Sequence, residues 1–152
     1  MTPTGPDRSM SRPFGDGYIA ELLKAVPIFS TCSKRELRTL AGVTDIVEFP
    51  QGATICEEGG DDADLFLIAE GTARVITGAR TRKHLSAGDF FGEIALLDHG
   101  PRTASVVTDM PVICLRVDSA GFRKLLGSDA GLAVKMLLEV ARRLRATDKT
   151  LD

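Results

Sequence analysis

The stretch that decides the fold is Phe91-Gly92-Glu93-Ile94-Ala95-Leu96-Leu97-Asp98-His99-Gly100-Pro101-Arg102-Thr103-Ala104-Ser105-Val106. It places a carboxylate, Glu93, nine positions before a guanidinium, Arg102, with a short apolar helical segment from Ile94 to Leu97 between them. A helix N-terminus, its free backbone N–H groups and one arginine form a site for a small phosphate. A carboxylate that faces the same site can accept hydrogen bonds from a sugar hydroxyl. The stretch therefore predicts a nucleotide pocket that neutralises one phosphate charge.

The neighbours of this charged pair favour a ligand site. Gly92 lets the backbone approach a ligand closely, Pro101 stiffens the approach to Arg102, and Ala104 leaves room for backbone amides to face a phosphate. The competing interpretation is a surface salt bridge between Glu93 and Arg102, which would stabilise the protein little. Because a charged, bidentate arginine–phosphate contact contributes about 1.5–3 kcal/mol, we expect Arg102 to make the largest single polar contribution to binding.

Length and composition describe one globular domain. The chain has 152 residues, of which 43% are hydrophobic and 26% charged, and its net charge is -2. It is long enough to bury a core, and its charge does not indicate a nucleic-acid-binding surface. No apolar run reaches the length of a membrane span, and residues 1–17 lack the apolar segment of a signal peptide. These features predict a cytoplasmic protein.

The cysteines and histidines predict neither a disulfide framework nor a metal site. Cys32, Cys56 and Cys114 are widely spaced and odd in number, which favours reduced, partly buried thiols. The two histidines, His84 and His99, lack the spacing of a zinc-binding helix.

Short alternating strands surround the opening stretch. We predict them at residues 43–49, 53–57, 65–69, 72–76, 82–85, 105–108 and 112–117, with turn signals such as Pro50-Gln51-Gly52 and Asp109-Met110-Pro111 between them. Many short strands at this spacing are typical of an antiparallel roll or barrel.

Helical patterns flank the strands on both sides. One helix is predicted from Tyr18 to Ala25, and a second is capped by Ser33 with Glu36 in a capping box and ends at Gly42. After the strands, Ser119 is expected to cap a short helix that Gly127 ends. A longer helix then begins at Asp129 and runs to about residue 147.

The predicted fold class is α+β: an antiparallel β-roll, a jelly-roll-like barrel, between N-terminal helices and two C-terminal helices. Residues 1–17 and 148–152 are expected to be tails, and residues 18–147 one domain. Within it, 18–42 form the N-terminal helices, 43–118 the roll with residues 91–105 as its phosphate-binding segment, and 119–147 the two C-terminal helices.

The stretch from Phe91 to Leu96, a five-residue spacer and the run from Arg102 to Val106 resemble the phosphate-binding cassette of the cyclic nucleotide-binding domain family. That family includes protein kinase regulatory subunits, cyclic-nucleotide-gated channels and catabolite-activator-type regulators. The segment from Gly52 to Gly71 also resembles an earlier strand signature of the family. Gly60 and Asp62 depart from the usual residues there, a turn-level difference that is expected to affect the site little.

The resemblance implies a role for each cassette position. Glu93 would accept the ribose 2′-hydroxyl, and Arg102 would pair with the cyclic phosphate. The backbone amides that complete the phosphate cradle would be those of Gly92, Ile94, Ala95 and Ala104. Leu96 or Leu97 would couple the cassette to the helix that carries Phe122, and the long helix after Asp129 would close over the base as a lid.

Thr103 leaves the choice of ligand open. In the resembling family, a hydroxyl residue directly after the arginine is associated with cGMP, whose guanine can fold syn and meet that hydroxyl. The alternative is that Thr103 contacts the phosphate alone. One hydroxyl hydrogen bond contributes about 0.5–1.5 kcal/mol, so at most about a tenfold preference would follow.

Four other features have simpler interpretations. The acidic run 57–64 lacks the ligand spacing of a calcium loop and is expected to be a solvated turn. The basic run 80–84 is expected to be a loop and edge strand, with contact of His84 or Leu85 with the purine as the alternative. The arginines Arg142, Arg143 and Arg145 are expected to complement the dipole at the helix end, with capping of the base or binding of a partner's acidic face as the alternatives. The apolar positions Leu137, Val140, Ala141 and Leu144 more often mean core packing than a dimer seam.

The function that the resemblance implies is a sensor that binds cAMP, cGMP or both, switches the lid helix when the ligand binds and has no catalytic activity. No arrangement of nucleophile, base or metal ligands stands out, so an enzyme such as a phosphodiesterase is not expected. The alternatives are a degenerate roll that serves as an interaction module, or a domain excised from a larger regulator or channel. We expect the sensor to act on a partner protein or a fused output domain. The chain itself is expected to be a monomer or a homodimer through the C-terminal helix. Neither nucleic-acid contact nor a membrane span is expected in this chain.

Overall fold

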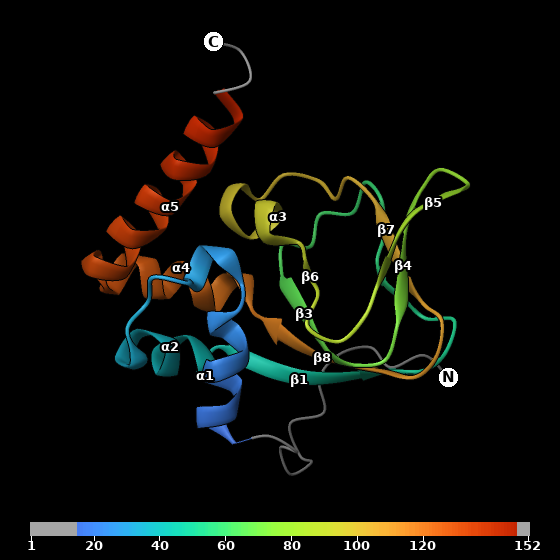
Figure 1. Ribbon diagram of the computed structural model, residues 1–152, viewed down its shortest axis with the longest axis horizontal. Helices are drawn as coiled ribbons and strands as arrows, with labels where there is room; N and C mark the ends of the chain where they lie inside the picture. Colours follow the sequence, from blue (N-terminus) through green and yellow to red (C-terminus); the bar gives the residue numbers. More distant parts are fainter. Residues whose placement is uncertain (1–14, 149–152) are drawn as a thin grey trace.

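The computed structural model describes residues 15–148, and in it a group of helices packs beside a roll of short strands (Figure 1). The helices are α1 (Asp16–Lys24), the 3-10 turn η1 (Pro27–Phe29), α2 (Lys34–Ala41), α3 (Glu93–Asp98), α4 (Ser119–Ser128) and α5 (Ala130–Asp148). The strands are β1 (Thr44–Phe49), β2 (Thr54–Cys56), β3 (Leu65–Glu70), β4 (Ala73–Thr77), β5 (Arg80–Leu85), β6 (Phe90–Phe91), β7 (Ser105–Thr108) and β8 (Val112–Val117). The predicted α+β roll with flanking helices is confirmed.

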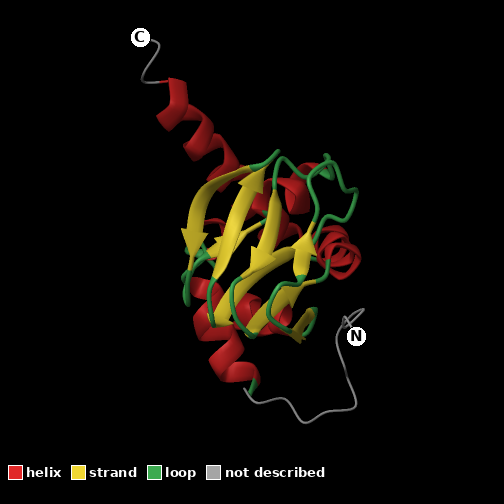
Figure 2. Ribbon diagram, turned by 90° about the vertical axis from the view of Figure 1, so that its right-hand side faces the viewer, coloured by secondary structure: helices red, strands yellow, loops and turns green. Residues whose placement is uncertain are grey.

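The strands form two antiparallel sheets whose strand orders are β1-β8-β3-β6 and β2-β7-β4-β5. β8 lies inside the first sheet, and Val117 is paired with both Thr44 of β1 and Leu65 of β3. The strands lie in front of most of the helices in Figure 2. Residues 1–14, which include most of the predicted N-terminal tail, and residues 149–152 lie outside the described residues.

Two apolar clusters fill the molecule. The larger joins the N-terminal helices, α4 and the start of α5 to the first sheet, and it contains Leu96 of α3 and Phe122 of α4. The rings of Phe29 and Phe122 meet edge-on in it at 6.1 Å between centroids. The second cluster lies inside the roll and includes Cys56, Ile68 and Cys114. Because α3 contributes Leu96 to the larger cluster, a shift of α3 displaces side chains of the helices that pack there.

Several element boundaries differ from the sequence predictions. α1 begins at Asp16, two residues before Tyr18. α4 is capped by Asp118, whose side chain accepts a hydrogen bond from the Gly121 amide, whereas Ser119 is the first helical residue. Gly127 lies within α4 and does not end it. β6 was not predicted, because a strand of two residues is too short for alternation to reveal it; its Phe90 and Phe91 pair with β3.

The apolar face of α5 corrects the expectation of core packing. Leu132 and Met136 are buried, but Leu137 is 68% exposed and Leu144 is 62% exposed. The C-terminal part of α5 runs past the end of the other helices (Figure 1), and Leu137, next to the buried Met136, faces away from the core. No helix of residues 15–148 has both the length and the apolar character needed to cross a bilayer.

The start of α5 is held to α2 by a half-buried ion pair between Lys135 and Glu36. The predicted capping box is confirmed, with Glu36 N donating to Ser33 Oγ at 3.2 Å and Ser33 N donating to Glu36 Oε1 at 2.8 Å. Lys135 Nζ of α5 donates to the same Oε1 at 2.5 Å, and the Glu36 side chain is only 4% exposed. The hydrogen bond from Lys135 and the two with Ser33 lower the pKa of Glu36 to about 2, against the desolvation that opposes them.

This pair predicts a specific loss of stability in acid. The pKa of Glu36 is lower in the folded chain than the ordinary value of 4.5, so the contribution of this carboxylate to stability is fully present above about pH 4.5 and is lost as the pH falls toward 2. We expect Glu36→Gln to lower the free energy of unfolding by on the order of 2–3 kcal/mol at neutral pH. Urea unfolding between pH 6 and pH 2 should show the two proteins converging in acid, and parallel curves would contradict this role.

Candidate functional site

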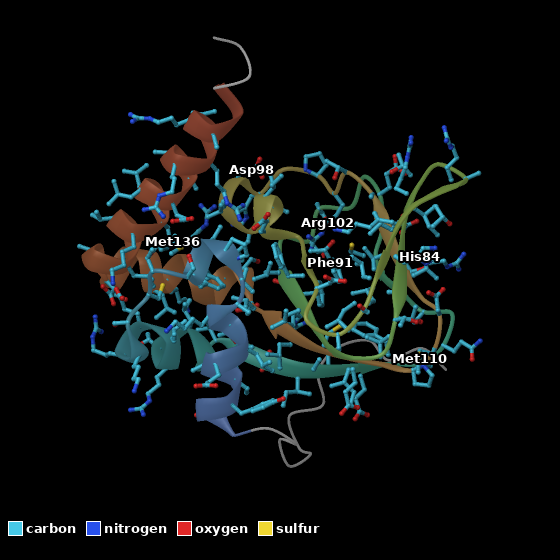
Figure 3. The ribbon with its side chains drawn as sticks, viewed as in Figure 1. His84, Phe91, Asp98, Arg102, Met110 and Met136 are labelled. Carbon is cyan, nitrogen blue, oxygen red and sulfur yellow. The ribbon has the colours of Figure 1, made fainter. Side chains whose placement is uncertain are left out.

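A cavity of about 440 Å³ opens where the β6–α3 corner meets the loop before β7. Cys56 of β2, Val75 of β4 and Val106 of β7 form its apolar side. In Figure 3, the side chains of Phe91 and Arg102 lie between α3 and the strands. The predicted ligand-contacting residues all line this cavity; they are Gly92, Glu93, Ile94, Ala95, Arg102, Thr103 and Ala104.

Arg102 is buried in the wall of the cavity, with its side chain only 4% exposed. Its Nε and Nη2 donate to the two carboxylate oxygens of Asp62 at 3.3 and 2.6 Å, and Nη2 also donates to the Asp64 carbonyl at 2.6 Å. Nη1 has no hydrogen-bond partner among the described residues. A buried guanidinium with an unused donor is costly, and a phosphate oxygen is the kind of acceptor that fits it.

The loop between β2 and β3 also fixes the backbone of Arg102. The Arg102 amide donates to the Gly60 carbonyl at 2.9 Å, and the Gly59 amide donates to the Arg102 carbonyl at 2.8 Å. Arg102 is therefore held by this loop through both its main chain and its side chain. The expectation that Asp62 affects the site little is wrong, because Asp62 is the carboxylate that orients the Arg102 guanidinium. Asp62 departs from the family's pattern in the sequence, but only the folded chain places its side chain against Arg102.

Gly92 is required where α3 begins. Its φ is +90°, a left-handed conformation that side chains rarely adopt. A Cβ at this position would also lie 2.6 Å from the Asp64 carbonyl oxygen and collide with Arg102 Nη1. The first amides of α3, those of Glu93, Ile94 and Ala95, have no acceptor in the preceding turn, and no side chain caps this end of the helix. These amides and Arg102 Nη1 make the corner suitable for an anion.

Glu93 is paired with the C-terminal helix. Its Oε2 lies 2.9 Å from Arg143 Nη1 of α5, an ion pair whose angles are not those of a hydrogen bond. The Glu93 side chain is 20% exposed. Glu93 and Arg102 thus have separate ion partners, which argues against the alternative of a surface salt bridge between them. Arg143 was expected to complement the helix end, to cap the base or to bind a partner, and its contact with the cassette is an ion pair that none of these expectations included.

The predicted coupling residues lie behind the cassette. Leu96 is buried in the same cluster as Phe122, and Leu97 packs partly buried against that cluster. His84 and Leu85 of β5 are not among the residues that line the cavity. In Figure 3, His84 lies beside the strands, apart from Arg102. β5 is an edge strand, as predicted for the basic run.

All three cysteines are free, and they are buried more completely than the partial burial that was predicted. Burial raises the pKa of the Cys56 thiol to about 11, although the Arg102 charge opposes the shift. Cys56 therefore faces the cavity as a neutral, weakly polar side chain. Within residues 15–148 there is no group of three or more His, Cys, Asp or Glu side chains that could hold a metal ion.

A comparison with protein families finds that the model of the cyclic nucleotide-binding domain matches residues 46–129. The chain belongs to the cyclic nucleotide-binding domain family. Curated relatives are similar to this chain over about 70% of its length. It is 34% identical over 74% of the chain to a cAMP-dependent protein kinase regulatory subunit of Colletotrichum orbiculare, and 38% identical over 69% of the chain to one of Aspergillus fumigatus. The chain spans 29% and 26% of the length of these two relatives.

Solved structures share the fold of this cyclic nucleotide-binding domain. The N-terminal domain of a transcriptional regulator from Streptomyces coelicolor superimposes with a TM-score of 0.78 at 25% identity, covering 84% of this chain and 95% of that one. The regulatory domain of Toxoplasma gondii PKA, crystallised with cAMP, gives a TM-score of 0.66 at 25% identity, covering 84% of this chain and 49% of that one.

Proposed function

We propose that this domain is a non-catalytic sensor that binds cAMP, cGMP or both in the cavity beside α3 and responds by moving α5. The observation that carries the proposal is the buried Arg102 guanidinium, whose Nη1 lies against Gly92 with no hydrogen-bond partner among residues 15–148. The family match and the cAMP in the Toxoplasma gondii neighbour support a cyclic nucleotide as the anion.

Each cassette group has one task in this proposal. The cyclic phosphate accepts from Arg102 Nη1 and from the first amides of α3, where the helix dipole favours negative charge. Glu93 accepts the ribose 2′-hydroxyl. Thr103 and Ala104 border the cavity beside Arg102, and Ala104 adds a backbone amide to the phosphate cradle.

The contact between Glu93 and Arg143 supports a response of α5. The carboxylate assigned to the ribose is the same carboxylate that pairs with α5 at 2.9 Å. A ligand that engages Glu93 changes the free energy of this ion pair, which is the differential interaction that a conformational shift needs. Displacement of α3 also reaches α4 through Leu96, Leu97 and Phe122, which pack in or against one cluster.

Side-by-side calorimetric titrations with cAMP and cGMP test the proposal. We expect binding of at least one nucleotide and no conversion of either one during prolonged incubation. Failure of both nucleotides to bind at millimolar concentration would favour the alternative of an interaction module with a degenerate roll. Turnover of either nucleotide would show that the domain is an enzyme.

Thr103 supplies a prediction about ligand choice. If its hydroxyl meets a syn guanine, Thr103→Ala should weaken cGMP binding by up to about tenfold and change cAMP binding less. Ser105→Ala is the matched control, because Ser105 carries a hydroxyl nearby but accepts a hydrogen bond from the Glu58 amide at 2.8 Å and is outside the cavity lining. Equal losses for the two nucleotides would assign Thr103 to the phosphate alone.

The output of the sensor is proposed to be a partner protein or a fused domain. The curated relatives are kinase regulatory subunits, so a kinase catalytic subunit is one such partner. The exposed leucines of α5, Leu137, Leu138 and Leu144, offer an apolar surface. The chain is proposed to be either a monomer or a homodimer through this helix. Analytical ultracentrifugation would distinguish the two states.

A further inference from the structure

Asp64 contacts the phosphate-binding arginine with its main chain and helix α4 with its side chain. Its carbonyl oxygen accepts from Arg102 Nη2 at 2.6 Å, and a Cβ on Gly92 would lie 2.6 Å from the same oxygen. Its Oδ1 accepts from the backbone amide of Ser119, the first residue of α4, at 2.8 Å. One residue, directly before β3, therefore touches both the cassette and the helix that leads to α5.

The contact with α4 is additional to the helix's own cap. Asp118 already caps α4 by accepting from the Gly121 amide at 2.8 Å. The amide of Ser119 is satisfied by a carboxylate that lies 55 residues earlier in the chain. A helix start has unsatisfied amides that any nearby acceptor can take, so a local residue or water would serve for stability alone. The use of Asp64 ties the helix to the loop that holds Arg102.

The Asp64 carboxylate is largely buried and lies near a second cation. Its side chain is 17% exposed, and its Oδ2 lies 3.8 Å from Arg116 Nε of β8. Arg116 in turn bonds to Asp45 of β1 at 3.2 Å. The carboxylate thus lies between the N-terminal end of α4 and the cation of a strand inside the first sheet.

We propose that Asp64 is a positioning residue that transmits ligand contact at Arg102 to the N-terminus of α4. This inference rests on the proposed function. When a bound phosphate shifts the Arg102 guanidinium, the Asp64 carbonyl that accepts its hydrogen bond shifts too. The Asp64 carboxylate then displaces the start of α4. This polar route is separate from the apolar route through Leu96, Leu97 and Phe122. Both routes reach α4, and α5 follows α4 directly.

The two contacts of Asp64 can be separated by mutation. Asp64→Ala removes the carboxylate that holds α4 but keeps the carbonyl that accepts from Arg102. Ser119→Pro removes the donor from the other side, and proline suits the first position of a helix because it lacks an N–H there. Asp64→Asn keeps an acceptor for Ser119. Asp45→Asn is the matched control, because it weakens the pairing of Arg116 without touching α4.

The readout is backbone hydrogen exchange, measured by mass spectrometry with and without saturating cAMP or cGMP, whichever binds. In the wild type we expect nucleotide to change exchange in residues 91–98 and in residues 120–128. In Asp64→Ala and Ser119→Pro, the change in 120–128 should fall to less than half, while the change in 91–98 persists. Asp64→Asn and Asp45→Asn should retain most of both changes.

Calorimetry on the same proteins separates the possible failures. We expect nucleotide affinity to change less than tenfold in Asp64→Ala, because the Arg102 contact is kept. If the wild type binds no nucleotide, the proposed function itself fails. If the wild type binds but residues 120–128 do not respond, or if either Asp64→Ala or Ser119→Pro keeps the full response there, the role of Asp64 is overturned. A merely structural contact would alter thermal stability without uncoupling the two segments.

Discussion

Arg102→Ala is expected to weaken cyclic nucleotide binding by about 10–150-fold, the equivalent of the 1.5–3 kcal/mol that a charge-assisted contact contributes. The Arg102 side chain is 4% exposed and its Nη1 is unpartnered among residues 15–148, so this donor is available for a phosphate oxygen without breaking another contact. Calorimetric titration with cAMP and cGMP measures the loss. Both nucleotides should be affected to a similar extent, because they share the phosphate.

The effect of Arg102→Ala on stability should be smaller than its effect on binding. Removing the guanidinium removes one unsatisfied buried donor, and its partner Asp62 is 44% exposed and remains solvated. Arg102→Lys should recover only part of the affinity, because lysine lacks the planar fork. Arg74→Ala is the matched control. Arg74 forms an ion pair of 2.7 Å with Asp109, and it is not among the residues that line the cavity. Unchanged affinity in Arg102→Ala would remove Arg102 from the phosphate site.

Gly92→Ala is expected to abolish detectable binding. The substitution forces a side chain into a left-handed conformation, which costs about 1–2 kcal/mol, and its Cβ would collide with Arg102 Nη1 and lie 2.6 Å from the Asp64 carbonyl oxygen. The guanidinium and the first turn of α3 must then move apart, so the donors no longer converge on one phosphate. Binding by calorimetry and unfolding in urea should both be measured.

Gly88→Ala provides a closely matched control. Gly88 has a φ of +94°, but a Cβ there would meet no atom within 4 Å. It should therefore show the conformational cost of about 1–2 kcal/mol without loss of binding. If Gly92→Ala and Gly88→Ala behave alike in both measurements, the close approach at Gly92 has no importance for the ligand.

The local parts of the fold could be predicted from the sequence. The Ser33–Glu36 capping box depends on residues three positions apart, and most strands have enough residues for alternation to mark them. β6 was missed because it has only two residues and exists through its pairing with β3. The exposure of Leu137 and Leu144 was missed because periodicity shows that a helix has an apolar face, not what that face meets.

By itself, the sequence determined the cassette: a glycine, a carboxylate, a short helix and an arginine at fixed spacing, whose chemistry is local and sufficient to indicate a phosphate site. Only the tertiary structure decided which groups surround it. Asp62 and Asp64 reach Arg102 from 40 and 38 residues away, and Arg143 reaches Glu93 from α5. Such contacts depend on the closure of the roll and the path of a helix, which no local pattern encodes, and they are the contacts through which we expect ligand binding to reach the rest of the molecule.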